Sequence, residues 1–158
     1  MAQWTQELPY FSDSELRCRH CHVLKLDLVF AALLVALRVA WGEALTPTSV
    51  CRCAEHNKAI GGHPTSMHLV ENPKHPTDGC AAVDVFWRLW NANQQLRFAR
   101  LAYKMGFSVG LHVGFVHLDV RSAAHIGLPK TIYTYSVWDN RFTVEEVKDY
   151  ERLENTDS

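Results

Sequence analysis

The alternation of hydrophobic and polar positions predicts both helices and short strands. Apolar residues fill almost every position from Leu24 to Trp41, as in a central helix that packs on several sides, and Gly42 is a typical helix end. Residues 91–105 show the spaced apolar positions of an amphipathic helix. Short runs rich in β-branched and aromatic residues predict strands, and Pro47 restricts the first of them to a sheet edge or a short strand. These runs are residues 44–50, 81–87, 107–112, 115–120 and 131–137.

Capping and turn residues place the shorter elements. Residues 12–15 offer a helix cap, residues 54–60 predict a short helix closed by a Gly-Gly pair, and residues 143–153 predict a charged C-terminal helix. Residues 61–79 predict a loop, because Pro, Gly, Asn and Asp are dense in their second half, at 71–79. We expect this loop to be exposed and to overhang a site.

The composition is that of one globular domain. A chain of 158 residues with 47% hydrophobic side chains can bury one substantial core, so we expect a single domain over 1–158 with its core at about 11–137. The net charge of −1 argues against a nucleic-acid partner or a charged membrane surface. The apolar run Leu28–Leu37 is too short for a bilayer, which needs roughly 20 residues. With no secretory leader at Met1, we expect the chain to be made in the cytoplasm. We also expect it to be a monomer.

Five cysteines form an odd set, which argues against a purely intramolecular disulfide framework. They are Cys18, Cys21, Cys51, Cys53 and Cys80. The close pairs Cys18/Cys21 and Cys51/Cys53 could form a second, structural zinc site, because neighbouring thiolates suit zinc. The alternative is that these cysteines are small core residues. The sequence leaves both open.

Two histidines and two carboxylates carry the candidate chemistry. His117 and Asp119 are two positions apart on a predicted strand, so their side chains share one face. Asp84 lies between two valines, and its burial requires a metal ion or a basic partner. His68 follows in the loop after the Gly-Gly pair, where a surface histidine is the alternative to a ligand. Two histidines and one carboxylate suit a tetrahedral zinc site that keeps one position open for water.

Several ordered blocks of the chain resemble the zinc D-Ala-D-Ala carboxypeptidase family, which includes phage endolysin peptidases and shares its fold with the hedgehog signalling domain. The blocks are Thr48–Asn57, Gly61-Gly62, Ser66-x-His68, Ala82-x-Asp84, Gly106-Phe107 and Phe115–Arg121. The likeness extends from about Phe11 to Arg121. It implies an α+β, hedgehog/DD-peptidase-like fold with a small antiparallel sheet packed against helices and a zinc site on the sheet face.

The resemblance also implies roles for individual residues. His68, Asp84 and His117 correspond to the ligands of one Zn²⁺ ion. Arg52 and Ser66 correspond to substrate-binding positions, and a bidentate guanidinium suits a carboxylate or carbonyl better than an ammonium does. The alternative for Arg52 is a structural salt bridge.

The chain departs from the family pattern between the first two ligands. Residues 69–83 separate His68 from Asp84, a stretch nine residues longer than usual, and the loop 71–79 carries the insertion. We expect the ligand geometry to survive if the extra residues bulge outward.

A second departure concerns the general base. Gly114 stands where many members have a Glu or Asp, three residues before His117. Asp119 is the nearest replacement, and the alternative is that it orients a histidine or Arg121. His112 matches a histidine of some members and could stabilise an oxyanion.

The resulting hypothesis is zinc-dependent hydrolysis of peptide bonds in peptidoglycan stem or cross-link peptides. The enzyme would be a D,D- or L,D-type carboxypeptidase or endopeptidase, as in a phage endolysin that reaches the wall after phage-type release. A carboxylate would take a proton as water attacks the carbonyl, and zinc with Arg52 or His112 would stabilise the oxyanion. The alternatives are a zinc-binding module without catalysis, acting in binding or phage assembly, and a phage structural protein.

Overall fold

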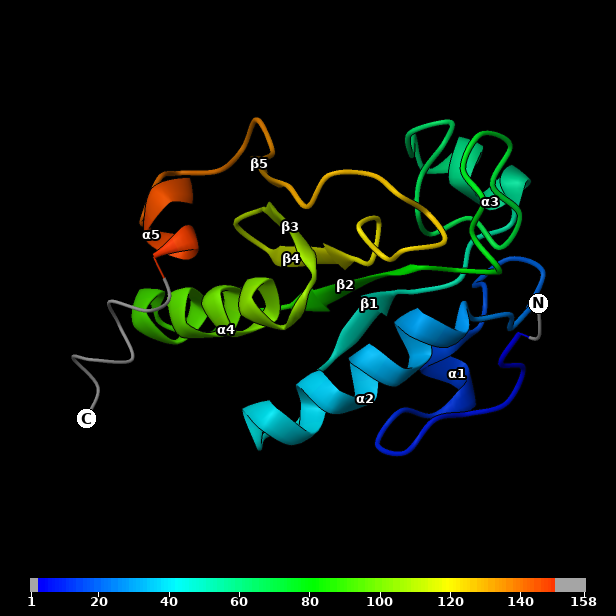
Figure 1. Cartoon of the computed structure of the whole chain (residues 1–158), viewed down its shortest axis with the longest axis horizontal. Coiled ribbons are helices and arrows are strands. Elements are labelled where there is room, and N and C mark those ends of the chain that lie inside the picture. Colours follow the sequence, from blue (N-terminus) through cyan, green and yellow to red (C-terminus); the bar gives the residue numbers. More distant parts are fainter. Residues whose placement is uncertain (1–2, 150–158) are drawn as a thin grey trace.

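Five strands form one sheet in the computed structural model, which describes residues 3–149 (Figure 1). In chain order the strands are β1 (Pro47–Ser49), β2 (Ala82–Phe86), β3 (Ser108–Leu111), β4 (Phe115–Asp119) and β5 (Ile132–Thr134). Their order across the sheet is β1-β2-β4-β3-β5. All five strand predictions are confirmed in position, although each strand is shorter than its hydrophobic run.

The sheet is mixed, which corrects the expected all-antiparallel arrangement at one edge. β2 pairs antiparallel with β1 and β4, and β3 and β4 form an antiparallel hairpin. β5 runs parallel to β3, with Val109 opposite Ile132. The reason is that β4 ends beside the start of β3, and the connection 120–131 stays at this end of the sheet. β5 therefore begins next to the start of β3 and runs in the same direction.

Helices cover one face of this sheet and its margins. They are α1 (Asp13–Leu16), α2 (Leu28–Trp41), α3 (Ala54–Ala59), α4 (Ala92–Met105) and α5 (Val144–Lys148). The long helices α2 and α4 lie below the sheet in Figure 1, whereas α3 and the loop 61–79 lie above the right-hand end of the sheet, away from α5. Together with the sheet, they make an α+β fold.

α2 begins four residues later than the hydrophobic pattern indicates. The Asp27 carboxylate accepts hydrogen bonds from the backbone N–H groups of Val29 and Phe30 and so caps the helix. Leu26, which precedes the cap, is buried in extended chain bridged to Trp4 and Cys80. An apolar residue therefore signalled burial here rather than helix. The predicted end at Gly42 is confirmed by its left-handed conformation.

The remaining element predictions agree with the structure within the described residues. Ser12 and Glu15 form a capping box at α1, and Asn91 and Gln94 form one at α4. Residues 61–79 form no helix or strand. The predicted helix 143–153 is present as α5, which ends at Lys148 with Asp149 as its cap, and residues 150–153 of the prediction lie outside the described part. No helix within residues 3–149 is both long and apolar enough to cross a membrane.

The core lies between the sheet and the two long helices. Val83 of β2 and Leu118 of β4 join Phe30 and Leu34 of α2 and Phe98 of α4 in one buried cluster. Because side chains alternate along a strand, the polar positions of β2 and β4 point to the opposite face. That face, away from α2 and α4, carries the candidate site.

Candidate metal centre

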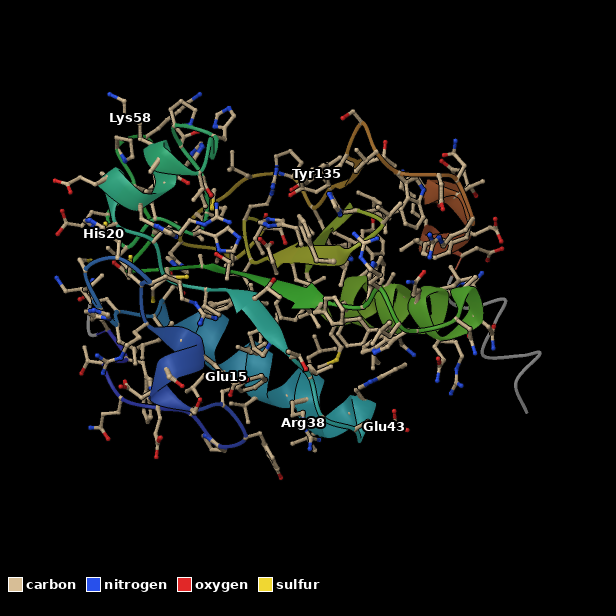
Figure 2. All side chains as sticks on the ribbon, turned by 180° about the vertical axis from the view of Figure 1, so that it is seen from behind. Glu15, His20, Arg38, Glu43, Lys58 and Tyr135 are labelled. Atoms are coloured by element: carbon tan, nitrogen blue, oxygen red, sulfur yellow. The ribbon has the colours of Figure 1, made fainter. Side chains whose placement is uncertain are left out.

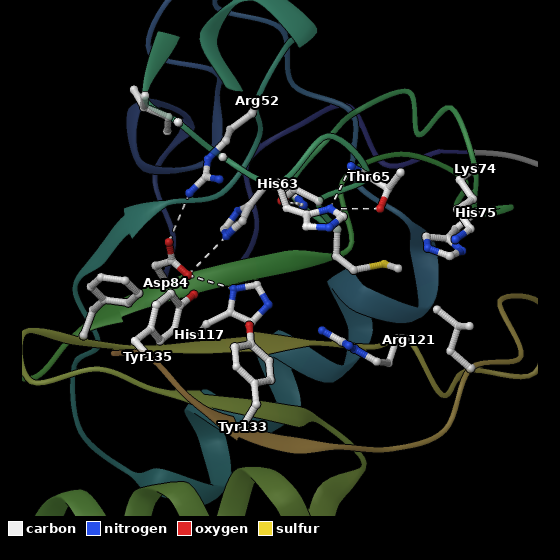
Figure 3. Close-up of a pocket in the computed structure, with 18 residues that line it drawn as sticks. Arg52, His63, Thr65, Lys74, His75, Asp84, His117, Arg121, Tyr133 and Tyr135 are labelled. Atoms are coloured by element: carbon white, nitrogen blue, oxygen red, sulfur yellow. Dashed lines mark hydrogen bonds and ion pairs between the residues drawn. The ribbon is translucent and has the colours of Figure 1, made fainter. Parts of the chain in front are cut away.

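His68, Asp84 and His117 meet on the face of the sheet opposite α2 and α4. The pairing of β2 with β4 sets Asp84 directly opposite His117 (Figure 3), and His68 belongs to the loop 61–79. Asp84 Oδ1 lies 3.1 Å from Nε2 of His68 and 2.9 Å from Nδ1 of His117. The three ligand atoms lie within 4.8 Å of one another, and all three residues are buried.

In each imidazole, the ring nitrogen that does not face Asp84 is hydrogen-bonded to another group of the protein. Nδ1–H of His68 donates to the Val50 carbonyl oxygen at 2.8 Å, which leaves the Nε2 lone pair for a metal. Nε2 of His117 lies 2.8 Å from Asp119 Oδ2, which leaves Nδ1 for the same metal. Such outer hydrogen bonds fix the ring and its tautomer in metal-binding histidines. The donor set of two imidazoles and one carboxylate therefore fits a catalytic zinc ion.

The electrostatics of the cluster suit a cation. Burial alone would raise the pKa of Asp84, but His68 and His117 outweigh it and hold that pKa far below the usual range. Burial lowers the pKa of His68, so this ring is neutral near pH 7. Burial also acts to lower the pKa of His117, but its hydrogen bonds to Asp119 and Asp84 raise it to about 9. A proton on His117 thus supplies positive charge in the metal-free protein.

This shift predicts a pH dependence of stability for the protein freed of metal by a chelator. Because the folded-state pKa of His117 is raised, its stabilising effect is complete below about 6.5 and is lost as the pH rises through about 9. The loss between these values is on the order of 3 kcal/mol. Denaturant unfolding of wild type and His117→Gln at several pH values measures it. An equal slope in both proteins would contradict the assignment.

Arg52 forms an ion pair with Asp84 of the candidate metal-binding group His68, Asp84 and His117, called the metal cluster below, and it also faces the cavity. Its Nη2 donates to Asp84 Oδ2 at 3.2 Å, its Nε to Ser49 Oγ at 3.0 Å, and its Nη1 to Asn57 Oδ1 at 3.3 Å. Figure 3 shows the guanidinium above Asp84, and only 9% of the residue is exposed. The salt bridge considered from the sequence is present, and the cavity-lining position keeps the substrate role open as well.

Replacing Gly62 with alanine is expected to disturb Arg52. A Cβ at this glycine would lie 2.0 Å from Asn57 Oδ1 and 3.2 Å from Arg52 Nη1, so Asn57 must move and release the guanidinium. Overpacking of this kind costs about 1–3 kcal/mol. We expect KM for a peptide substrate to rise several-fold while bound zinc is unchanged.

A matched control is Gly61→Ala. That glycine has a positive φ of 74° but no atom near its would-be Cβ, so the variant carries backbone strain without the clash. A KM change of the same size in both variants would show that Asn57 does not hold Arg52 in place.

Asp119 lies behind His117 rather than in the cavity. Its Oδ2 contacts His117 Nε2, and its Oδ1 accepts from the backbone N–H and, at 2.9 Å, the Nε–H of Arg121. Asp119 is 0% exposed. Burial acts to raise its pKa, but His117 and Arg121 hold it well below the usual range. These contacts agree with the alternative considered from the sequence, in which Asp119 orients His117 and Arg121.

His112 and Gly114 lie at the turn before β4. His112 stacks on Phe115 with ring centroids 4.1 Å apart, and its Nδ1 accepts the Gly114 N–H at 2.9 Å. His112 is not among the residues that line the cavity, whereas Phe115 is. A Cβ at Gly114 would lie 2.8 Å from Arg88 Nη2. An arginine thus occupies the space beside the position where the family has its usual base.

A cavity of about 620 Å³ opens over the metal cluster. The loop 61–79 forms one wall, with Lys74 and His75 facing inward, so the insertion shapes the site and does not simply bulge into solvent.

The side chain of Asn72 stabilises this wall through hydrogen bonds to residues on both sides of Asn72 in the chain. Its amide donates to the carbonyls of Thr65 and Ser66, and its oxygen accepts the N–H groups of Lys74 and His75. Ser66 Oγ accepts the N–H of His68, so it supports a ligand and also lines the cavity.

Two tyrosines on β5 and in the residue after it complete the opposite wall, and they are absent from the sequence-derived site. Tyr133 and Tyr135 point toward His117 and Asp84 in Figure 3. Burial raises the pKa of both phenols, which therefore stay protonated and can donate hydrogen bonds. Their i, i+2 spacing on a predicted strand was the available signal. Gly110 makes room for one of them, since a Cβ there would lie 2.6 Å from Tyr133 Cζ.

The cysteines fall into two groups. The sulfur atoms of Cys18, Cys21 and Cys53 lie within 4.8 Å of one another, outside the cavity. Cys51 does not join them, and its thiol interacts with that of Cys80 in the core. All five are free thiols. Of the four cysteines grouped from the sequence, Cys18, Cys21 and Cys53 lie together in the structure and Cys51 does not.

A family model described as Peptidase M15 matches residues 9–119. No curated protein and no solved structure matches the chain.

Proposed function

Because this chain belongs to the peptidase M15 family, we propose that it hydrolyses peptide bonds of peptidoglycan stem or cross-link peptides in a zinc-dependent reaction. The observation that supports this most directly is the convergence of His68, Asp84 and His117 beneath an open cavity. Each imidazole there has one nitrogen bonded to the protein and the other turned to the same point.

We assign the roles within the cavity as follows. His68 Nε2, Asp84 and His117 Nδ1 hold the zinc ion, which when bound supplies a Lewis acid and an activated water. The protonated hydroxyls of Tyr133 and Tyr135 are placed to donate to an oxyanion. Asp119 is a positioning residue that keeps His117 in its orientation.

The charges of the cavity wall favour an anionic peptide. Arg52, Lys74 and Arg121 line it, whereas Asp84 is the only carboxylate among the lining residues that the structure describes. A guanidinium or ammonium suits a peptide carboxylate. Peptidoglycan stem peptides carry such groups, so we assign Arg52 and Lys74 to the substrate carboxylate. An endolysin that meets the wall after release from the cell is the setting we propose.

The test uses the full chain, loaded with zinc, on purified peptidoglycan and on a D-Ala-D-Ala dipeptide. We expect release of new amino groups, loss of activity with a chelator and its return with zinc. Mass spectrometry of the products identifies the bond and separates carboxypeptidase from endopeptidase cleavage. No new amino groups from either substrate, with zinc bound, would refute the proposal.

One observation favours a second candidate, a zinc-binding module of the same fold without catalysis. Gly114 removes the usual base, Arg88 lies beside it, and the described cavity wall carries no carboxylate besides Asp84. In this case the loaded protein binds stem peptides without cleaving them. Co-sedimentation with peptidoglycan in the absence of product release would support this candidate over the enzyme.

A further inference from the structure

A second cluster of metal-binding side chains lies apart from the cavity. Cys18 and Cys21 follow α1, and Cys53 is the N-terminal cap of α3, yet their sulfur atoms lie within 4.8 Å of one another. Cys18 is fully buried and Cys21 is exposed, so the cluster lies at the protein surface, where an ion can enter. None of the three forms a disulfide.

The backbone around the cluster is arranged for thiolates. The N–H of Cys53 donates to Cys18 Sγ at 3.4 Å, and the N–H of His56 donates to Cys53 Sγ at 3.4 Å. A tight turn holds the first two cysteines. In it the N–H of Cys18 donates to the Val23 carbonyl and that of His22 to the Cys18 carbonyl. N–H groups directed at sulfur stabilise its charged, metal-binding form.

His20 offers a fourth donor beside Cys53, although it lies outside the group of three sulfurs that are within 4.8 Å of one another. His20 Nδ1 lies 3.5 Å from Cys53 Sγ, and Figure 2 shows His20 on the N-terminal loop beside α3. Its Nε2 lies 3.8 Å from a carboxylate oxygen of Glu55, the kind of outer partner that orients a ligating histidine. Three thiolates and one imidazole form a closed tetrahedral set typical of structural zinc.

We propose that Cys18, Cys21, Cys53 and His20 bind a structural zinc ion, separate from the metal centre of the cavity. Zinc–sulfur bonds of about 2.3 Å in a tetrahedron place the sulfurs about 3.8 Å apart, so the three sulfurs need to approach one another by no more than about 1 Å. The exposed His20 ring, already beside Cys53, has to turn toward the other two sulfurs. The ion ties residues 18–21 to the start of α3. Cys53 is next to Arg52, so the same ion steadies the arginine of the cavity.

Metal analysis of the full chain, purified under reducing conditions, tests the proposal. We expect about two zinc ions per chain in the wild type and about one in each of Cys21→Ser and His117→Ala, with none in the double variant. Cys21 is exposed, so its replacement leaves the core intact, which circular dichroism verifies. The two losses are independent, so the outcome does not depend on the proposed peptidase activity.

Cobalt substitution gives a second readout that needs no activity. Cobalt bound by thiolates has a strong near-ultraviolet charge-transfer band, which the cavity ligands cannot produce. We expect the band in wild type and in His117→Ala, and its loss in Cys21→Ser. Cys51→Ala is the matched control, because Cys51 is a buried thiol outside the cluster and its loss should leave the band unchanged.

Two outcomes would overturn the proposal. One is a wild-type protein with a single zinc that disappears in His117→Ala and with no thiolate band. The other is a disulfide among the three cysteines, found by mass spectrometry of protein purified without oxidant. Either result would leave the proposed peptidase function standing.

Discussion

Replacing His117 with alanine is expected to abolish zinc binding at the cavity and to reduce peptidase activity to that of the metal-free protein. The variant removes one of the three proposed ligands and leaves Asp84 without the imidazole opposite it. Loss of an outer hydrogen-bond partner alone costs about 10–100-fold in metal affinity or activity, so loss of a ligand should cost more. Metal analysis and amino-group release from peptidoglycan measure the two effects.

His75→Ala serves as the comparison for this variant. His75 also lines the cavity but lies on the loop wall and not in the metal cluster, so zinc content should be unchanged. Full zinc occupancy of the cavity site in His117→Ala would remove His117 from the ligand set.

Asp119→Asn is expected to weaken zinc binding at the cavity by about 10–100-fold, with activity largely restored once zinc is saturating. The reason is that Asp119 contacts His117 Nε2 and Arg121 and is fully buried behind the metal cluster. A general base would behave differently. Its loss lowers kcat by about 10²–10⁴-fold even when zinc is saturating. Zinc titrations followed by kcat at saturation distinguish the two roles.

Arg121→Gln is the control for the Asp119 variant. It removes the guanidinium that holds Asp119 but keeps the hydrogen bond to His117, so we expect a smaller loss of zinc affinity than in Asp119→Asn. A large, zinc-independent fall in kcat for Asp119→Asn alone would make Asp119 the base.

Much of the metal cluster could be predicted because the strand pattern is local. Alternation along a strand places His117 and Asp119 on one face whatever the strand pairs with. A carboxylate between valines, such as Asp84, requires a cationic partner whatever the fold. The sequence could not give the register that sets Asp84 opposite His117, since pairing depends on the whole sheet.

The features that the sequence did not reveal depend on segments distant along the chain. Tyr133 reaches the cavity because β5 joins β3 in parallel and Gly110 leaves space for its ring. Arg88 approaches Gly114 from the chain after β2, a contact with no local pattern. The start of α2 was misplaced for a related reason, since Leu26 is buried by tertiary bridges and not by a helix.

The side chain of Asn72 has a consequence for how this protein can diversify. One amide holds the loop wall that bears Lys74 and His75. Of the proposed metal ligands, Asp84 and His117 lie on β2 and β4, and His68 lies earlier in the same loop with its Nδ1 on the Val50 carbonyl. Lys74 and His75 therefore follow the Asn72 anchor in this loop, whereas His68 precedes it and is held by separate hydrogen bonds. Changes of length or charge within residues 73–78 can alter which peptide is accepted without disturbing the reactive centre, so this loop is the natural place to engineer a new substrate preference.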